Sequence, residues 1–400
     1  MSEVVVVGIG ADGWAGLSET AQAAVLSAEV LLGSRRQLAL VPDHAGGERL
    51  PWPSPLMPAL PGLLGAQRGR RACVLASGDP MHHGIGAAIL RALGPERVTV
   101  LPAASSISLA CARLGWAMEE VEVVGLVGRP PELLHPRITP GRRLLVLGAG
   151  AATVAGLLSS RGYEASGLTV LEQLGGPRER VVRGTAASGW PPGDPLTIVA
   201  VECVGSAVLP AQPGLPDDAY VHDGQLTKRE VRAISLARLA PVPGQLLWDV
   251  GAGAGSIAIE WMRAHPSCRA VAVEADPSRA ARVRTNAAAL GVPGLSIVEG
   301  RAPAALDALP RPDAVFVGGG LTEPGMVEAC WSALAPGGRL VANAVTLESE
   351  AILAAWHAKM GGDLTRIEVS RAGPVGGFTA WRPALPVVQW AAVRTEEPAR

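Results

Sequence analysis

Short apolar runs alternate with stretches of helical character along the first half of the chain, and this alternation restricts the fold more than any other feature. Expected strands lie at residues 4–7, 72–76, 98–101, 121–126, 143–147 and 196–201, and expected helices at 19–28, 84–93 and 105–114. Such alternation is typical of α/β proteins in which most strands are parallel. We therefore expect an α/β fold with a largely parallel sheet.

The second half repeats the alternation. Expected helices lie at residues 228–239, 256–264, 277–290 and 347–360, and expected strands at 246–250, 270–274, 295–298, 314–317, 339–342, 365–369 and 387–393. The last two strands follow each other without a helix, and a glycine-rich turn at 373–377 lies between them. Because parallel neighbours need a long crossover, this spacing predicts a terminal antiparallel hairpin.

The length of the chain predicts more than one domain. It has 400 residues, 48% of them hydrophobic, which is too long for one ordinary core. Residues 209–216 contain three prolines and a glycine and form the clearest linker. We place one domain at residues 1–208 and a second at 217–400.

Charge and cysteine usage argue against several classes of protein. The formal net charge of −1 gives no basic field to attract nucleic acid, so we expect no nucleic-acid partner. No apolar run approaches the roughly 20 residues of a membrane span. The start Met1-Ser2-Glu3 lacks the basic region of a signal peptide, which predicts a cytoplasmic protein. The five cysteines form no Cys-x-x-Cys pair, so we expect neither a disulfide framework nor a metal site.

A glycine-rich stretch lies at the junction of expected strand 246–250 and expected helix 256–264. Its candidate cofactor-binding residues are Gly251, Ala252, Gly253, Ala254 and Gly255. Missing Cβ atoms let such a turn approach a ligand closely. Glu274 ends the next strand about 20 residues later, where a carboxylate can accept hydrogen bonds from a ribose diol. The pattern indicates a cofactor that carries a nucleoside; the alternative is a tight turn beside an ordinary exposed glutamate.

The spacing of the glycines distinguishes between cofactors. The dinucleotide pattern is Gly-x-Gly-x-x-Gly, whereas here the third glycine comes one position early, which resembles the S-adenosylmethionine version. Ala302 follows the strand after which that fold usually contacts adenine. The triplet Gly318-Gly319-Gly320 replaces the Asn-Pro-Pro-Tyr-like clamp of base-modifying enzymes and leaves room for a bulky planar substrate.

The segment before this loop identifies a family. Asp223-Gly-x-x-Thr227-Lys228-x-Glu-Val-Arg232-Ala, followed by the glycine loop, resembles the decarboxylating precorrin methyltransferases over residues 215–394. The resemblance implies a C-terminal class I, Rossmann-like methyltransferase fold. Thr227 is either a cofactor contact or the N-cap of a capping box with Glu230. Lys228 is one of two lysines in an arginine-rich chain, and codon usage is the alternative explanation for it.

Three loops of the first half resemble, in their order, the tetrapyrrole methylase family over about residues 1–205. Their candidate cofactor-binding residues are Gly8, Gly10, Ser77, Gly78, Asp79, Ser105 and Ser106. The resemblance implies a two-lobed fold with the cofactor in the cleft, which residues 202–205 would close. Relatives often have Ser-Leu-His-Gly-Arg where this chain has Gly125-Leu-Val127-Gly-Arg129. His82 and His83 lack further metal ligands nearby, so we expect them to contact the substrate.

The order of the halves resembles the fused precorrin methyltransferases. This implies methylation of a tetrapyrrole at C-5 by the N-terminal half, and at C-15, with loss of the ring C acetate carboxyl as carbon dioxide, by the C-terminal half. It also implies one S-adenosylmethionine per half, no metal, and a homo-oligomer. Two alternatives remain open: the C-terminal half modifies tRNA, or one half is a non-catalytic binding module.

The substrate of this family carries several carboxylates, which arginine can bind bidentately. Arg129, Arg229 and Arg232 are the candidate substrate clamps, with solvated surface arginines as the alternative. Asp79, Asp223 and Lys228 are the candidate catalytic groups facing the substrate.

Overall fold

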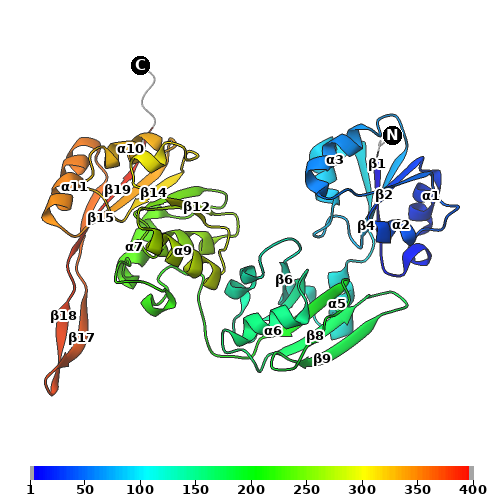
Figure 1. Cartoon of the computed structure of the whole chain (residues 1–400), viewed down its shortest axis with the longest axis horizontal. Helices are drawn as coiled ribbons and strands as arrows, with labels where there is room; N and C mark the ends of the chain where they lie inside the picture. The colour runs from blue at the N-terminus through cyan, green and yellow to red at the C-terminus, as the bar shows by residue number, and fades with distance from the viewer. Residues whose placement is uncertain (1–3, 396–400) are drawn as a thin grey trace. The chain divides into compact units, whose positions relative to one another are not determined.

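The computed structural model describes residues 4–395, so the expectation based on residues 1–3 lies outside it. The chain forms two compact units that divide between Ala207 and Val208, apart from the short segment Glu132–Pro136, which is assigned to the second unit (Figure 1). This division falls next to the segment in which the sequence predicts the linker.

The first lobe of the N-terminal unit is an all-parallel sheet of order β3-β2-β4-β1-β5. Its strands are β1 Val4–Ile9, β2 Val30–Gly33, β3 Glu48–Pro51, β4 Ala72–Ser77 and β5 Val98–Leu101. Its helices are α1 Glu19–Ser27, α2 Arg35–Ala39, α3 Leu56–Gly65 and α4 Gly86–Leu93. Alternate side chains of β1 enter two different cores, Val7 with Val25 and Val6 with Leu60. Both faces of the sheet are therefore covered, as parallel sheets require.

The second lobe is mostly antiparallel. It contains β6 Val121–Gly125, β7 Arg143–Leu147, β8 Gly167–Glu172, β9 Arg180–Thr185 and β10 Thr197–Glu202, with helices α5 Ser106–Leu114 and α6 Ala151–Ser159. In the order β6-β7-β10-β8-β9, only β6 and β7 pair in parallel. The prediction of largely parallel strands is wrong for this lobe. No helix separates β8, β9 and β10, and connections without a crossover join antiparallel strands.

The C-terminal unit contains a seven-stranded sheet of order β13-β12-β11-β14-β15-β19-β16. Its strands are β11 Leu246–Val250, β12 Arg269–Glu274, β13 Ser296–Glu299, β14 Ala314–Val317, β15 Arg339–Ala344, β16 Asp363–Ile367 and β19 Val387–Val393. The helices are α7 Arg229–Leu239, α8 Ser256–Ala264, α9 Pro277–Ala289, α10 Met326–Ala333 and α11 Leu347–Met360. The first five strands of this order are parallel, whereas β19 is antiparallel to both neighbours.

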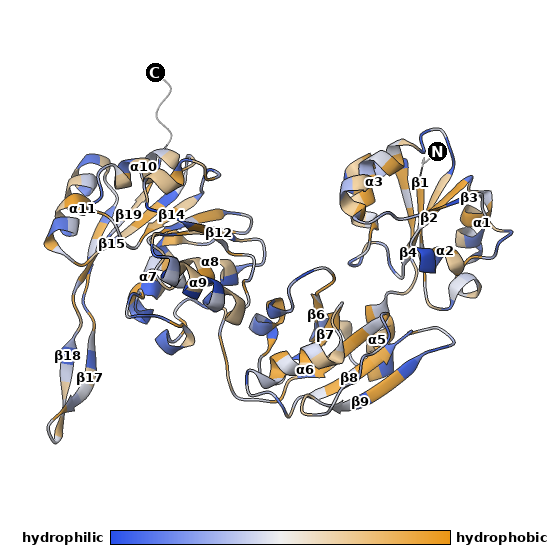
Figure 2. Ribbon diagram, viewed as in Figure 1, coloured by the Kyte–Doolittle hydropathy of each residue, from blue (hydrophilic) through white to orange (hydrophobic). Residues whose placement is uncertain are grey.

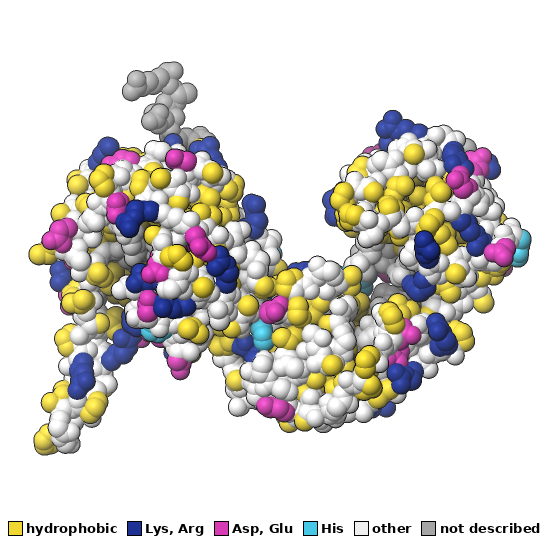
Figure 3. All heavy atoms as spheres, in the orientation of Figure 1, with side chains coloured by type: hydrophobic (Ala, Val, Ile, Leu, Met, Phe, Trp, Pro, Cys, Tyr) yellow, Lys and Arg dark blue, Asp and Glu magenta, His cyan; other side chains and the backbone are white. Residues whose placement is uncertain are grey.

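The antiparallel end of this sheet carries a feature that the sequence did not reveal. β16 and β19 pair as predicted, but the residues between them form a separate hairpin of β17 Ser370–Val375 and β18 Phe378–Pro383. This hairpin extends away from the sheet (Figure 1). Apolar residues are concentrated in the strands of the three larger sheets (Figure 2). On the face drawn in Figure 3, acidic and basic side chains are interspersed.

Candidate active sites

The C-terminal unit has a cavity of about 610 Å³ beyond the carboxyl ends of β11, β12 and β14. Strand order reverses beside β11, and open α/β sheets bind ligands at such a point. Residues predicted from the sequence that line this cavity are Thr227, Lys228, Gly251, Ala252, Gly253, Glu274, Ala302, Gly318, Gly319 and Gly320. The tertiary structure therefore brings together residues that are spread over almost 100 positions of the chain.

The glycine loop has a backbone that only glycine can adopt without strain. Gly251 and Gly253 have φ values of +70° and +58°. A Cβ atom on Gly253 would lie 2.9 Å from the Gln225 carbonyl oxygen. Gly255 also has a positive φ, but a Cβ atom there would lie 2.7 Å from Val283 Cγ1 on α9, away from the cavity. Ala254 is buried, with 2% of its surface exposed. Neither Ala254 nor Gly255 is among the cavity-lining residues, so both shape the loop without facing the cavity.

Glu274 is a buried carboxylate. Its side chain is held by two backbone donors, because Oε2 accepts from Gly253 N at 2.8 Å and Oε1 from Asp276 N at 3.0 Å. The alternative of an ordinary exposed glutamate is wrong, since Glu274 is only 6% exposed. Each carboxylate oxygen can accept a further hydrogen bond. Glu274 therefore fixes the glycine loop and can still accept a hydrogen bond from a ribose hydroxyl.

Asp249 is the penultimate residue of β11, separated from the glycine loop by Val250, and is 1% exposed. Its Oδ2 accepts from Ala258 N in the first turn of α8 at 3.0 Å. Burial raises the pKa of Asp249 to about 7, and the nearby charge of Glu274 adds to this shift. The carboxyl group thus ties the strand to the helix that the loop connects.

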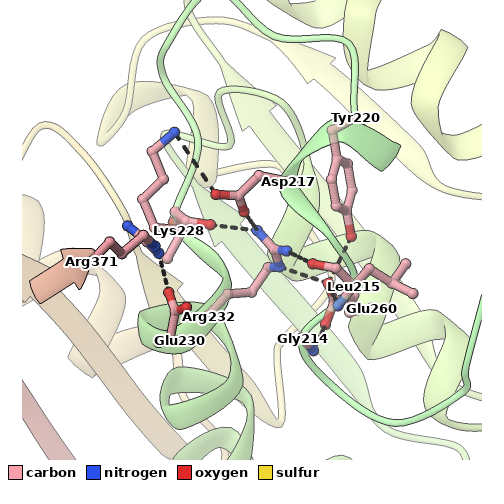
Figure 4. Close-up of polar contacts among 10 residues, drawn as sticks. Gly214, Leu215, Asp217, Tyr220, Lys228, Glu230, Arg232, Glu260 and Arg371 are labelled. Atoms are coloured by element: carbon pink, nitrogen blue, oxygen red, sulfur yellow. Dashed lines mark hydrogen bonds and ion pairs between the residues drawn. The ribbon is translucent and has the colours of Figure 1, made fainter. Parts of the chain in front are cut away.

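Arg232 does not face the cavity. Its side chain has no exposed surface, and its Nε donates to Glu260 Oε1 at 2.6 Å (Figure 4). The other guanidinium nitrogens donate to the carbonyl oxygens of Thr227 and Leu215 and to Asp217. A guanidinium whose donors are used inside the protein cannot reach a substrate. Arg232 is therefore a structural residue rather than the predicted clamp.

Glu260 is the centre of this buried network. Besides Arg232, it accepts hydrogen bonds from Gly214 N at 2.6 Å, Leu215 N at 3.0 Å and the Tyr220 hydroxyl at 2.8 Å. Burial, together with the charge of Glu260, raises the pKa of Tyr220 well above its ordinary value. The end of the predicted linker is thus fastened to the core of the C-terminal unit, and the start of α7 is fixed with it.

Lys228 and Glu230 take positions that the sequence did not predict. The N-cap of α7 is Lys228, without a side-chain cap, so the capping box of Thr227 and Glu230 is wrong. Glu230 instead forms an ion pair with Arg371 of β17 (Figure 4). Both residues line the cavity. Lys228 Nζ lies 3.9 Å from Asp217 Oδ2 and is 46% exposed. Lys228 is therefore free to approach a ligand.

Asp223 and Arg229 are close to the cavity but do not line it. Asp223 Oδ2 is 3.0 Å from Arg279 Nε and 2.6 Å from Arg282 Nη1. Hydrogen bonds from these two arginines hold the pKa of Asp223 well below its ordinary range. An aspartate that stays ionised is a poor proton donor, and its contacts position the turn at Gly224. Arg229 is exposed at the start of α7.

The hairpin supplies cavity residues that no sequence pattern indicated. Arg371 comes from β17, and apolar side chains around the hairpin base complete the wall: Ile367, Val369, Leu385 and Val387. Arg301 also lines the cavity and pairs with Glu323 at 2.9 Å. Glu230 and Arg371 are 141 positions apart, so their pairing has no local sequence signal.

The N-terminal unit has a cavity of about 480 Å³ lined by residues of both its lobes. Of the predicted residues, those that line it are Gly10, Ser77, Gly78, Ser106 and Arg129. The two histidines, His82 and His83, line it as well. This cavity therefore lies where the sequence places the cofactor cleft.

Three predicted residues have structural contacts instead. A Cβ atom on Gly8 would lie 2.1 Å from the Gly78 carbonyl oxygen, so Gly8 permits close approach of β1 and the loop after β4. Ser105 caps α5 by accepting from Ser108 N at 3.0 Å. Asp79 Oδ1 accepts from Met81 N at 2.8 Å. None of the three is among the lining residues of this cavity.

The prediction that residues 202–205 close the cleft is wrong. β10 runs antiparallel to β7, with Ile198 opposite Leu147, so the beginning of β10 reaches the cavity and its end points away from it. Arg36, which no sequence pattern indicated, also lines this cavity, and its Nη2 donates to Ser77 Oγ at 2.7 Å. Partial burial lowers the pKa of Arg36.

Two further properties concern residues 4–395 only. No group of three or more His, Cys, Asp or Glu side chains is placed to hold a metal ion among these residues. No helix in the same range has both the length and the apolar character needed to cross a membrane.

The folds and cavities of the two units define a protein with two methyltransferase domains. Two family profiles match: tetrapyrrole (corrin/porphyrin) methylases over residues 3–188 and the precorrin methyltransferase domain over residues 218–394. The precorrin-6Y C(5,15)-methyltransferase [decarboxylating] of Sinorhizobium sp is 49% identical over 396 residues, covering 97% of this chain and 95% of that protein.

A similar relative is the precorrin-6Y C(5,15)-methyltransferase [decarboxylating] of Mycobacterium tuberculosis (strain CDC 1551 / Oshkosh), 47% identical over 397 residues, 98% of this chain and 100% of that protein. The crystal structure of the C-terminal domain of precorrin-6Y C5,15-methyltransferase from Rhodobacter capsulatus is 45% identical and covers 46% of this chain and 100% of that one, with a TM-score of 0.45. The chain belongs to the family of decarboxylating precorrin-6Y C5,15-methyltransferases, and its family uses S-adenosylmethionine.

Proposed function

We propose that this chain methylates precorrin-6Y at C-5 and C-15 and removes the ring C acetate carboxyl as carbon dioxide, giving precorrin-8X in the cytoplasm. The N-terminal unit performs the C-5 methylation, and the C-terminal unit performs the C-15 methylation with the decarboxylation. The observation that carries this proposal is that each unit has its own cavity, lined by several motif residues of its own methyltransferase family.

Each cavity would hold one S-adenosylmethionine, which supplies an electrophilic methyl group on a sulfonium. In the C-terminal unit, the missing Cβ atoms of Gly251 and Gly253 would let the cofactor approach the backbone closely, and Glu274 would accept hydrogen bonds from its ribose diol. Ala302 lies at the adenine position that the family resemblance implies. In the N-terminal unit, Gly10, Gly78 and Ser106 supply backbone and hydroxyl groups.

The C-terminal cavity contains exposed cations that can bind substrate carboxylates. Lys228, Arg301 and Arg371 line it, and each is near a carboxylate of the protein: Asp217, Glu323 and Glu230, respectively. A substrate carboxylate can replace these partners, because all three cations are at least 46% exposed. The glycine triplet 318–320 and the apolar hairpin base leave room for the flat macrocycle.

Decarboxylation needs an electron sink, which the conjugated macrocycle can supply itself. The protein contributes position and exclusion of water, which accelerate methyl transfer by alignment of the reacting atoms. In the N-terminal cavity, Arg36 and Arg129 are the cations available for substrate carboxylates. Self-association of the chain stays part of the proposal, and light scattering of the purified protein tests it.

Mass spectrometry of precorrin-6Y incubated with the full chain and S-adenosylmethionine tests the function. We expect two methyl gains and the loss of one carbon dioxide. Calorimetry should show two cofactor sites per chain. An unchanged substrate mass would contradict the proposed reaction, and a single cofactor site would indicate that one half is a binding module.

A further inference from the structure

We propose that His83 is the catalytic base of the N-terminal cavity and takes up the proton that the substrate carbon loses when it is methylated. This inference rests on the proposed C-5 methylation and adds the residue that completes it. Neither the family comparison nor the cofactor motif assigns a role to His83.

The backbone holds His83 in an unusual conformation. His83 lies in the loop between β4 and α4 with a φ of +56°, which is uncommon for a residue other than glycine. The loop is fixed on both sides, because His82 N donates to the Asp79 carbonyl oxygen at 3.2 Å and Gly86 N to the Pro80 carbonyl oxygen at 2.9 Å. Non-glycine residues in the left-handed region are concentrated at functional sites.

The ring of His83 packs against a glycine of the opposite lobe. A Cβ atom on Gly125, the last residue of β6, would lie 3.3 Å from His83 Nδ1, so glycine gives the imidazole its space. The Gly125 carbonyl oxygen accepts from Arg129 Nη1 at 3.1 Å. The His83 ring and the Arg129 guanidinium thus both contact Gly125 of β6, on one wall of the cavity.

His83 is one of few groups in this cavity that can accept a proton. Among the described residues that line it, there is no carboxylate, and the titratable side chains are Arg36, His82, His83 and Arg129. Arginine stays protonated in proteins, so the choice lies between the two histidines. Their rings stack at 5.1 Å between centroids, and His83 is the one placed against β6.

The charges around His83 favour its neutral form. Partial desolvation lowers the pKa of His83, and the neighbouring His82 and Arg129 lower it further. Arg36 is the remaining charged group that lines the cavity. A neutral imidazole at physiological pH has a ring nitrogen free to take up a proton.

The proton balance of the reaction requires such an acceptor. The substrate carbon uses a π-electron pair to form the bond to the methyl group, and the methyl–sulfur bond breaks with its pair going to sulfur. The methylated macrocycle is then one charge more positive. Transfer of the hydrogen from the methylated carbon to His83 as a proton returns the bonding pair to the ring. No oxidant or reductant takes part.

The test compares His83→Gln with the matched control His44→Gln in the full chain, because His44 is exposed in the N-terminal unit and does not line the cavity. Single-turnover reactions followed by mass spectrometry report C-5 methylation, while C-15 methylation and decarboxylation in the same chain serve as the internal control. We expect His83→Gln to slow C-5 methylation by about 100-fold or more, within the usual range for general bases. His44→Gln should leave the C-5 rate unchanged, and neither variant should change cofactor affinity or the C-15 reaction.

The pH profile separates a catalytic role from a structural one. In the wild-type chain, the C-5 rate should rise with pH and level off once His83 is neutral; in His83→Gln this rise should be lost, and added imidazole should restore part of the rate. An unchanged rate and profile in His83→Gln, or an equal loss in His44→Gln, would overturn the assignment. A wild-type chain that performs only the C-15 reaction would instead refute the proposed function of the N-terminal unit and, with it, this inference.

Discussion

Replacing Glu274 with alanine tests the geometry of the C-terminal cofactor site. The substitution removes the acceptor for Gly253 N and Asp276 N and the proposed acceptor for the ribose diol. A charge-assisted hydrogen bond contributes about 1.5–3 kcal/mol. Cofactor affinity at this site should therefore fall by about 10–100-fold.

The same substitution should also lower stability, because two backbone donors lose their partner. A buried donor without an acceptor costs about 1–3 kcal/mol, and water entering from the cavity will reduce this. We expect the free energy of unfolding of the C-terminal unit to fall by about 2 kcal/mol. The glycine loop should become more mobile as a result, which weakens the site further.

Calorimetric titration of the full chain with S-adenosylmethionine measures this effect. In Glu274→Ala, one of two sites should weaken and the other should keep its affinity. Glu299→Ala is the matched control, since Glu299 ends the neighbouring strand β13, pairs with Arg284 at 2.6 Å and does not line the cavity. Unchanged affinity at both sites of Glu274→Ala, or equal weakening in Glu299→Ala, would refute the reasoning.

Three other substitutions give distinct outcomes. The folded-state pKa of Asp249 lies above the ordinary 3.8, so the contribution of Asp249 to stability is greatest at low pH and falls by about 1.4 kcal/mol per pH unit between roughly pH 4 and 7. Denaturation of Asp249→Asn across this range should lack that loss. The same pH dependence of the unfolding free energy in Asp249→Asn and wild type would contradict the prediction. Arg371→Gln should raise the KM for the macrocycle in the C-15 reaction by about 3–10-fold without changing cofactor affinity, whereas Arg366→Gln, on β16 outside the cavity, should change neither. Gly253→Val should abolish C-15 methylation and decarboxylation together but leave C-5 methylation intact, because a side chain there meets the Gln225 carbonyl oxygen; retained C-15 activity would show that the loop does not hold the cofactor.

The sequence by itself determined the features that depend on contiguous residues. The strand and helix alternation located the five parallel strands of the C-terminal sheet, and the glycines at 251 and 253 marked the turn that approaches a ligand. Glu274 could be found because its distance from the loop is fixed by the length of one helix and one strand. The loops at Ser77 and Ser106 were found in the same way, through local patterns.

Only the tertiary structure decided which of the polar side chains face a cavity. In the sequence, Arg232 could not be distinguished from its exposed neighbour Arg229. In the structure, Arg232 on α7 is completely buried and pairs with Glu260 on α8. Arg371 became a site residue because the hairpin returns to α7, and sequence periodicity carries no information about such long-range pairing. Strand direction was equally hidden: the apolar run at 196–201 predicted β10, but its antiparallel pairing decides which end reaches the cavity. Local patterns specify elements, whereas the contacts between distant elements specify burial, ion pairs and, at His83, which ring lies against Gly125.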